Sequence, residues 1–162
     1  MINVYDNFLP SYYFKQLQSF VMSEWFNWYW NDGVSYKEDE DYQFIHFFYR
    51  DNPDEPTDTF SHIEPCISYF NMKKIYRIKA NLRSKTIFHR KSLYHTDGPE
   101  WGPHKTAILY MNTCNGYTKF KKGGKVKSVE NRVVIFDSDL EHAGVTCTDE
   151  KRRVVVNFNY EV

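Results

Sequence analysis

A histidine and an aspartate stand two residues apart at His95-Thr96-Asp97, a spacing that makes them candidates for one metal site. In an extended strand, residues i and i+2 point to the same face, so an imidazole and a carboxylate can approach one ion together. A chain with six histidines also contains such a pair by chance, and two ordinary polar residues at a strand end are an equally acceptable interpretation. The pair needs further context.

That context comes from His142, which follows the β-branched run RVVIFD in the segment SDLEHAG. Antiparallel folding can bring His142 beside the strand that carries His95 and Asp97. Two imidazoles and one carboxylate on one face leave three neighbouring coordination positions open, an arrangement whose usual metal is Fe(II). Arg153 opens the next strand, RVVVNFNY, where its planar guanidinium could hold a carboxylate through two hydrogen bonds.

The strands that must position these side chains are predicted from residue 75 onward. Short β-branched or alternating runs recur there at intervals of about 8–12 residues, with turn dipeptides such as Asn115-Gly116 and Gly123-Gly124 between them. This pattern is typical of an antiparallel sandwich or barrel. We expect a hairpin at GYTKF and GKVKSV, and further strands at IYRIKANL, TIFHRKSLYH, TAILYMN, RVVIFD and RRVVVNFNY.

Supporting helices are expected in the first 74 residues. Apolar residues recur at spacings of three and four from Phe14 to Phe26, which predicts an amphipathic helix that begins near Pro10 and ends at about residues 25–27. We also expect a strand over 42–49, a loop over 51–58 and a second helix over 61–70. The prediction is one mainly β (α+β) domain over 1–162, with 1–74 as helices, support and lid, and 75–162 as the core.

Composition excludes several other classes of protein. The 162 residues carry 21 Lys+Arg and 21 Asp+Glu, and a formal net charge of zero argues against a cationic nucleic-acid binder. Three cysteines without a CxxC motif argue against a zinc knuckle or a disulfide scaffold and favour a reducing compartment. No apolar run approaches the ~20 residues of a membrane span, and no secretory signal pattern is seen. We therefore expect a cytoplasmic protein with no membrane partner.

The ordered set of motifs resembles the Fe(II)- and 2-oxoglutarate-dependent dioxygenases, in particular their prolyl-4-hydroxylase-like branch with a double-stranded β-helix (jelly roll). The resemblance covers about residues 75–161 and rests on His95-x-Asp97, ILYMN, Gly123-Gly124, VVIFDS, His142, and Arg153 leading to Asn157-Phe158-Asn159. Segments such as NTCNGYTKF are also similar to small oxygenases of viruses and bacteria. A virus-encoded protein of this kind would act in the cytoplasm of the host cell.

The resemblance implies roles for six residues. His95, Asp97 and His142 would hold the catalytic iron; Arg153, or else Arg152, would bind the distal carboxylate of 2-oxoglutarate. Tyr110 would support that carboxylate, and Asn159 would contact the cosubstrate or a ligand histidine, unless it belongs to a polar network in the core.

The implied reaction hydroxylates a C–H bond of an unidentified substrate. It would consume O₂ and 2-oxoglutarate and release succinate and CO₂, with ascorbate as a further cofactor. The resemblance favours a peptidyl proline or another protein side chain over a small molecule or a nucleic-acid base.

Other interpretations stay open at this point. A non-catalytic jelly-roll or cupin-like module that binds a ligand or partner would not need the four residues to converge; a metal cupin would want His-x-His. A zinc hydrolase would need a general-base Glu that the sequence does not offer. His104 could touch substrate, although an ordinary loop histidine is favoured, and Trp101 could line the mouth of the site. His46 and His89 suit the core or surface. The hairpin lysines suit protection of a sheet edge better than phosphate binding.

Overall fold

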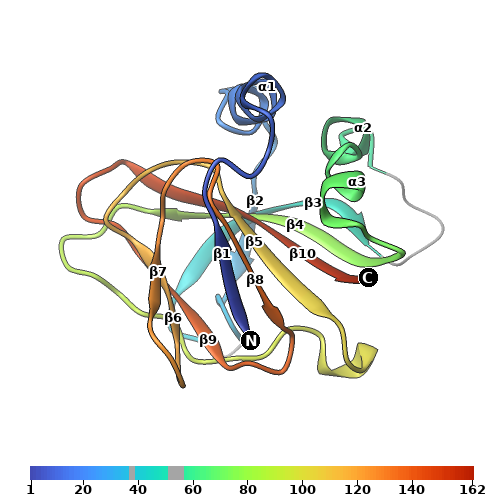
Figure 1. The fold of residues 1–162 in the computed structure, drawn as a ribbon. Helices are drawn as coiled ribbons and strands as arrows, with labels where there is room; N and C mark the ends of the chain where they lie inside the picture. Colours follow the sequence, from blue (N-terminus) through green and yellow to red (C-terminus); the bar gives the residue numbers. More distant parts are fainter. Residues whose placement is uncertain (37–38, 51–56) are drawn as a thin grey trace.

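Two antiparallel β-sheets face each other, and the helices cover the outer face of the larger sheet (Figure 1). The computed structural model describes residues 1–36, 39–50 and 57–162. The predicted loop over 51–58 therefore lies almost entirely outside the described residues. Among the helices described, none has the length and apolar character needed to cross a bilayer.

The larger sheet has seven strands in the order β1-β8-β5-β10-β4-β3-β2. In chain order these are β1 (Ile2–Tyr5), β2 (Tyr29–Asp32), β3 (Tyr42–Arg50), β4 (Lys74–Ser84), β5 (Lys105–Tyr110), β8 (Val133–Asp137) and β10 (Arg152–Glu161). The smaller sheet has the order β7-β6-β9, with β6 (Tyr117–Phe120), β7 (Lys125–Lys127) and β9 (His142–Val145). The helices are α1 (Ser11–Val21), α2 (Phe60–Ile63), α3 (Cys66–Phe70) and the 3₁₀ turn η1 (Pro99–Trp101).

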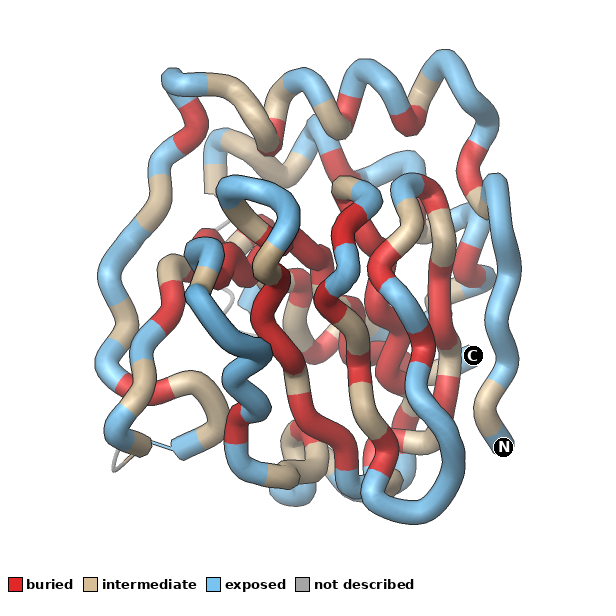
Figure 2. Tube along the Cα trace, turned by 90° about the vertical axis from the view of Figure 1, so that its left-hand side faces the viewer, coloured by how far each residue is buried: buried red, intermediate tan, exposed pale blue. Residues whose placement is uncertain are grey.

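Alternation along the central strands creates two apolar cores, one on each face of the larger sheet. On β5, Ala107 and Leu109 face the helices, whereas Ile108 and Tyr110 face the smaller sheet. The helix side is closed by Phe14, Leu17 and Val21 of α1, each of which is buried. Figure 2 shows buried positions concentrated along the central strands, while α1 keeps an exposed side.

The mainly β, double-stranded β-helix class predicted from the sequence is confirmed. The predicted hairpin is also present, since β6 pairs with β7, and the strand expected over 42–49 is β3. β7 is an edge strand of the smaller sheet, as the interpretation of its lysines requires. Two short N-terminal strands, β1 and β2, were not expected; they extend the larger sheet at its two ends.

The predicted length of the first helix is wrong, because α1 ends at Val21 rather than near residues 25–27. Ser23 closes the last turn: its N–H and its hydroxyl both donate to the carbonyl of Phe20, at 3.2 and 2.8 Å. A short polar side chain that binds a backbone carbonyl competes with further helical bonds. Trp25, counted as part of the apolar face, is 89% exposed.

The single helix predicted over 61–70 is two short helices, α2 and α3, with Pro65 as the residue before α3. Proline cannot donate the backbone bond that a continuous helix would need at this position.

The strand predicted at TIFHRKSLYH is also wrong. This segment lies beside β9 and is joined to it only by scattered backbone hydrogen bonds and two isolated bridges, which pair Lys91 with Val145 and His95 with His142. Its apolar residues Ile87 and Phe88 are 88% and 80% exposed, so the alternation that suggested a strand does not bury a face.

Asn131 ties the N-terminal segment to the loop before β8. Its side chain accepts from Leu9 N–H at 2.9 Å and donates to Leu9 O at 2.8 Å, in a buried setting. The backbone of Asn131 has φ of +57°, which asparagine tolerates better than most residues. Both the side chain and the backbone conformation thus suit this position.

We predict that Asn131→Gly lowers the free energy of unfolding by about 2 kcal/mol, because glycine keeps the backbone conformation but leaves two buried backbone groups unpaired. The matched control is Asn71→Gly: Asn71 also has positive φ (+53°), and its side chain makes no hydrogen bond within the described residues. Urea unfolding of both variants checks this. Equal losses would contradict the role assigned to the Asn131 side chain.

Candidate functional site

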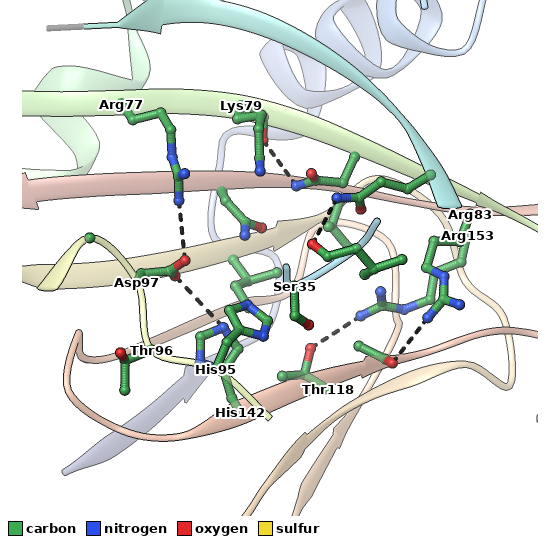
Figure 3. A pocket seen from close by; sticks show the side chains of 18 residues that line it. Ser35, Arg77, Lys79, Arg83, His95, Thr96, Asp97, Thr118, His142 and Arg153 are labelled. Atoms are coloured by element: carbon green, nitrogen blue, oxygen red, sulfur yellow. Dashed lines mark hydrogen bonds and ion pairs between the residues drawn. The ribbon is translucent and has the colours of Figure 1, made fainter. Parts of the chain in front are cut away.

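A backbone bridge holds His95 and His142 side by side at the edge of the smaller sheet. His95 N–H donates to His142 O and His142 N–H donates to His95 O, both at 3.0 Å. The next turn of chain is fixed in the same way, because Asp97 N–H donates to Ser138 O at 3.1 Å. The segment after residue 90 and the start of β9 therefore place three potential ligands at one end of the cavity between the sheets (Figure 3).

The ligand atoms of His95, Asp97 and His142 all lie within 4.8 Å of one another. His142 Nε2 is 3.7 Å from Asp97 Oδ2. Each histidine directs its other ring nitrogen, Nδ1, to a backbone carbonyl: His95 to Leu93 O at 3.3 Å and His142 to Leu140 O at 3.0 Å. With Nδ1 donating, the lone pair of each Nε2 is left for a metal ion.

Asp97 is oriented by hydrogen bonds from the larger sheet. Arg77 donates to its Oδ1 at 3.1 Å, and the Thr106 hydroxyl donates to its Oδ2 at 3.1 Å. Asn159 lies behind both donors: it donates to Thr106 Oγ1 and accepts from Arg77 Nε, each at 3.0 Å. Asn159 is fully buried and does not line the cavity. It therefore contacts the two residues that bond Asp97 and does not reach the cavity itself.

The protonation states suit metal binding. Burial opposes ionisation of Asp97, but the surrounding groups, His142 and Arg77 foremost, outweigh it and hold the pKa of this carboxyl well below its usual range. Burial, with the neighbouring His142, lowers the pKa of His95 to about 4. At neutral pH the pair therefore offers a carboxylate and a neutral imidazole, the forms that coordinate metal ions.

Arg153 lies in the same cavity as the three potential ligands. Its side chain is 4% exposed; Nε donates to Ser128 Oγ at 2.8 Å and one terminal nitrogen donates to Thr118 Oγ1 at 3.1 Å. Both partners are neutral hydroxyls, so the guanidinium charge is not compensated by them. Arg152 points to the other face of the sheet and donates to Met22 O at 2.7 Å. Of the two arginines, only Arg153 lines this cavity.

Tyr110 stands behind Arg153 rather than in the cavity. It is fully buried, its hydroxyl donates to Thr118 Oγ1 at 2.8 Å, and the Arg153 guanidinium lies 5.5 Å from its ring centre. Thr118 thus accepts from both Tyr110 and Arg153, which leaves its own hydroxyl hydrogen to donate elsewhere. These contacts connect Tyr110 to a carboxylate site indirectly, through Thr118 and through the Arg153 guanidinium.

Strand β4 supplies residues that the sequence interpretation missed. Arg77, Lys79, Asn81 and Arg83 alternate along β4 and all line the cavity opposite the two histidines (Figure 3). Arg83 forms an ion pair with Asp41. The signal was available, because charged or amide side chains that alternate with apolar ones indicate a strand with one polar face.

The other candidates lie elsewhere. Trp101 stacks on Tyr76, and His104, beside them, directs Nδ1 to Gly102 O at 2.8 Å; neither lines the cavity of the triad. His46 is buried between Asn27 O and the Thr59 hydroxyl, and His89 is exposed. The three cysteines are buried and free.

Comparison with known proteins gives one consistent result. No family model matches the sequence, and no curated protein sequence matches it. Solved structures do match. A 2OG-Fe(II) oxygenase family oxidoreductase from Burkholderia pseudomallei superimposes with a TM-score of 0.72 at 9% identity, over 99% of this chain and 84% of that one.

Two prolyl hydroxylases are similar over most of their length. A prolyl-4-hydroxylase from Pseudomonas putida gives a TM-score of 0.62 at 14% identity, over 99% of this chain and 92% of that one. The viral collagen prolyl hydroxylase of Paramecium Bursaria Chlorella virus-1 gives 0.60 at 14% identity, over 99% and 90%.

The chain has the fold of the 2OG-Fe(II) oxygenases.

The donor set of this oxygenase fold suits iron. Two imidazoles and one carboxylate, gathered at one end of the cavity, are the ligand types that non-haem Fe(II) oxygenases use, and the set includes no thiolate that would favour zinc or copper(I). The bonds from Arg77 and Thr106 to Asp97 are the outer contacts that fix a ligand before the metal arrives.

We predict that the protein binds one divalent ion per chain in this cavity, with Co(II) as a spectroscopic probe. His142→Ala should weaken binding by about 100-fold, because one of three protein ligands is lost. His89→Ala, which removes an exposed histidine, should bind as the wild type does. Anaerobic titration measures both, and equal affinities would show that the ion binds elsewhere.

Gly116 gives a second prediction, because it makes room for Arg153. A Cβ at this position would lie 2.7 Å from Arg153 Cδ and 2.9 Å from Val145 O. Gly116→Ala should cost about 1–3 kcal/mol of stability through overpacking and should displace the guanidinium. Gly124→Ala is the control, since its Cβ would meet nothing within 4 Å. Thermal unfolding checks this, and an unchanged midpoint for Gly116→Ala would refute the packing argument.

Proposed function

We propose that this protein is an Fe(II)- and 2-oxoglutarate-dependent dioxygenase that hydroxylates a C–H bond. The observation that carries the proposal is the placement of the His95, Asp97 and His142 ligands and the uncompensated Arg153 in one cavity. A metal site needs only the first three residues. Arg153 is buried and has no carboxylate partner among the described residues. Its place in the same cavity supports a dianionic cosubstrate that reaches from the metal ligands to the guanidinium.

His95, Asp97 and His142 would hold the iron. Fe(II) bound there would supply the oxidation of a C–H bond by O₂, coupled to conversion of 2-oxoglutarate into succinate and CO₂. The protein's part is to keep His95 neutral and Asp97 ionised, and to keep both ligands in place through Leu93 O, Arg77 and Thr106.

Arg153 would bind the distal carboxylate of 2-oxoglutarate through the N–H groups of its guanidinium that do not donate to Ser128 or Thr118. The Thr118 hydroxyl, which already accepts two hydrogen bonds, would donate its own hydrogen to that carboxylate. Tyr110 would then support the cosubstrate through Thr118, and not by direct contact. A charge-assisted, two-point contact of this kind is stronger and more directional than a contact to lysine.

Asn159 would act as a positioning residue for the metal ligand. It bonds both Thr106 and Arg77, the two donors to Asp97, so it would fix their geometry without touching the cosubstrate.

The substrate is proposed at a coarser level. The prolyl hydroxylases among the similar structures support a protein side chain, such as a peptidyl proline, over a nucleic-acid base. The three free, buried cysteines support a reducing, cytoplasmic location, in a host cell if the protein is virus-encoded. Ascorbate, expected from the resemblance, stays a prediction.

The test is an anaerobic titration of the protein with Fe(II) and 2-oxoglutarate, followed by exposure to O₂ and measurement of succinate. We predict one equivalent of each ligand bound, a visible charge-transfer band and slow succinate release without added substrate. His142→Ala should reduce succinate to background. Stoichiometric binding of Fe(II) without any binding of 2-oxoglutarate would contradict the proposal and favour a metal-binding module.

The neighbouring arginines provide a matched pair of variants. Arg153→Lys should weaken the binding of 2-oxoglutarate by about tenfold or more and leave the affinity for the metal unchanged, because a point charge replaces the planar guanidinium. Arg152→Lys makes the same chemical change on the opposite face of β10 and should bind 2-oxoglutarate as the wild type does. Calorimetry of both variants measures this, and a larger loss in Arg152→Lys would reverse the assignment.

A further inference from the structure

Lys79 is the cation of this cavity that the metal and cosubstrate assignments do not use. Figure 3 shows its side chain pointing from β4 into the cavity, whose lining it shares with His95 and Asp97. Arg77, two residues along the same face of β4, bonds Asp97, so Lys79 lies near the end of the cavity where the candidate metal ligands are.

Lys79 differs from the other three cations of the cavity in lacking a polar partner. Arg77 pairs with Asp97, Arg83 pairs with Asp41, and Arg153 is held by two hydroxyls. Within residues 1–36, 39–50 and 57–162, Lys79 Nζ makes no hydrogen bond or ion pair, and its aromatic neighbour Phe47 lies 6.0 Å away. Burial, together with Arg77, lowers the pKa of Lys79 to about 7.

The positive charge of the cavity exceeds what iron and 2-oxoglutarate account for. Four cationic side chains line the cavity, and two carboxylates, Asp97 and Asp41, pair with two of them. Fe(II) would add two positive charges and the 2-oxoglutarate dianion would remove two. A cavity with an unpaired cation favours a ligand that brings an anionic group to that cation, since uncompensated charge is costly away from bulk water.

Two amide oxygens beside Lys79 indicate that the ligand also carries a hydrogen-bond donor. Asn157 is the direct neighbour of Lys79 across the β10–β4 pair, and Asn81 is two residues along the same face of β4. The side-chain oxygens of both asparagines are buried and have no hydrogen-bond partner. Buried acceptors of this kind need a donor, and Lys79 does not supply it in this structure.

Lys79 and the two unpaired amide oxygens lie on neighbouring positions of β4 and β10. Together they favour a small ligand that has both an anionic group and a hydrogen-bond donor. Phosphate or sulfate satisfies the cation but offers the acceptors few or no hydrogens. A carboxylate with an N–H group on the adjacent carbon satisfies both, and the spacing of paired residues, about 5 Å, matches the size of such a group.

We propose that Lys79, Asn81 and Asn157 form the subsite for the primary substrate, which presents a carboxylate to Lys79 and an N–H group to the two amide oxygens. The ligand class is an α-amino acid, either free or as the C-terminal residue of a peptide. It narrows the protein side chain proposed above to one on a C-terminal residue, and it excludes proline in a peptide, which has no N–H. This inference rests on the proposed function, because it places the substrate beside the iron and 2-oxoglutarate.

The test uses the anaerobic protein loaded with Fe(II) and 2-oxoglutarate, and three probes in calorimetry: glycine, diglycine and glycinamide. Glycine or diglycine should bind at least tenfold more tightly than glycinamide, which lacks the carboxylate. A preference for glycine identifies the free amino acid as the source, and a preference for diglycine identifies a peptide C-terminus.

Lys79→Met should weaken the binding of the preferred probe at least tenfold and leave the affinity for 2-oxoglutarate within twofold of the wild-type value. Lys127→Met, which removes an exposed lysine of β7, should change neither affinity. Lys79→Met should also unfold at the same temperature as the wild type or higher, since it removes an unpaired and partly desolvated charge.

Several results would refute the assignment of this substrate subsite. These are binding of neither glycine nor diglycine, equal binding of glycinamide, unchanged probe affinity in Lys79→Met, or a loss of thermal stability in that variant. A loss of 2-oxoglutarate affinity in Lys79→Met as large as in Arg153→Lys would move Lys79 into the cosubstrate site. Failure of the wild type to bind 2-oxoglutarate at all refutes the proposed function itself, and is therefore a distinguishable outcome.

Discussion

The antiparallel pairing of β4 with β10 at the centre of the larger sheet is the constraint on which the rest of the site depends. Because side chains alternate along both strands, one set of residues fills the core under the helices and the other set faces the smaller sheet. Ile78, Ala80, Val154 and Val156 belong to the first set. Lys79, Asn81, Arg153 and Asn157 belong to the second and line the cavity. A shift of one residue in this register would exchange the two sets and remove the site.

The same register decides which charges can be tolerated between the sheets. Arg77 is compensated by Asp97 and Arg83 by Asp41, so each adds order without leaving a free charge. The structure accepts Arg153 and Lys79 without a carboxylate partner among the described residues, a cost that a stable fold has no reason to carry unless a ligand offsets it. Charge placement therefore connects the fold to the proposed chemistry: Arg77 orients the candidate metal ligand Asp97, and the uncompensated Arg153 and Lys79 would bind anionic groups.

How much of this could be predicted from the sequence differs from residue to residue. His95 and Asp97 were recognisable because a two-residue spacing has a direct geometric meaning in an extended chain. His142 was recognisable because it follows a clearly patterned strand, and Arg153 because it opens one. Alternation showed that Arg152 and Arg153 point to opposite faces, and the choice of Arg153 rested on the family resemblance, through its spacing to Phe158-Asn159. This choice agrees with the cavity lining. The supporting contacts were not predictable, since Thr106 and Arg77 bond Asp97 from two separate strands, and Asn159 bonds these two donors from a third.

The errors have equally local causes. Residues 86–95 have the composition of a strand, but their backbone bonds to β9 are irregular and their apolar side chains are exposed. The helix α1 ends early because Ser23 satisfies the carbonyl of Phe20. In both places a few side-chain or backbone bonds outweigh the periodic pattern, and such bonds leave little trace in spacing alone.

The central claim is that one cavity holds the metal at one end and the distal carboxylate of 2-oxoglutarate at the other. A crystal structure grown without oxygen, with Fe(II) and 2-oxoglutarate present, tests it most directly. The account predicts a single ion bonded to His95, Asp97 and His142, and a carboxylate held by the Arg153 guanidinium and the Thr118 hydroxyl. An ion bound outside this triad, or a cosubstrate whose distal carboxylate lies on a residue other than Arg153, would contradict it.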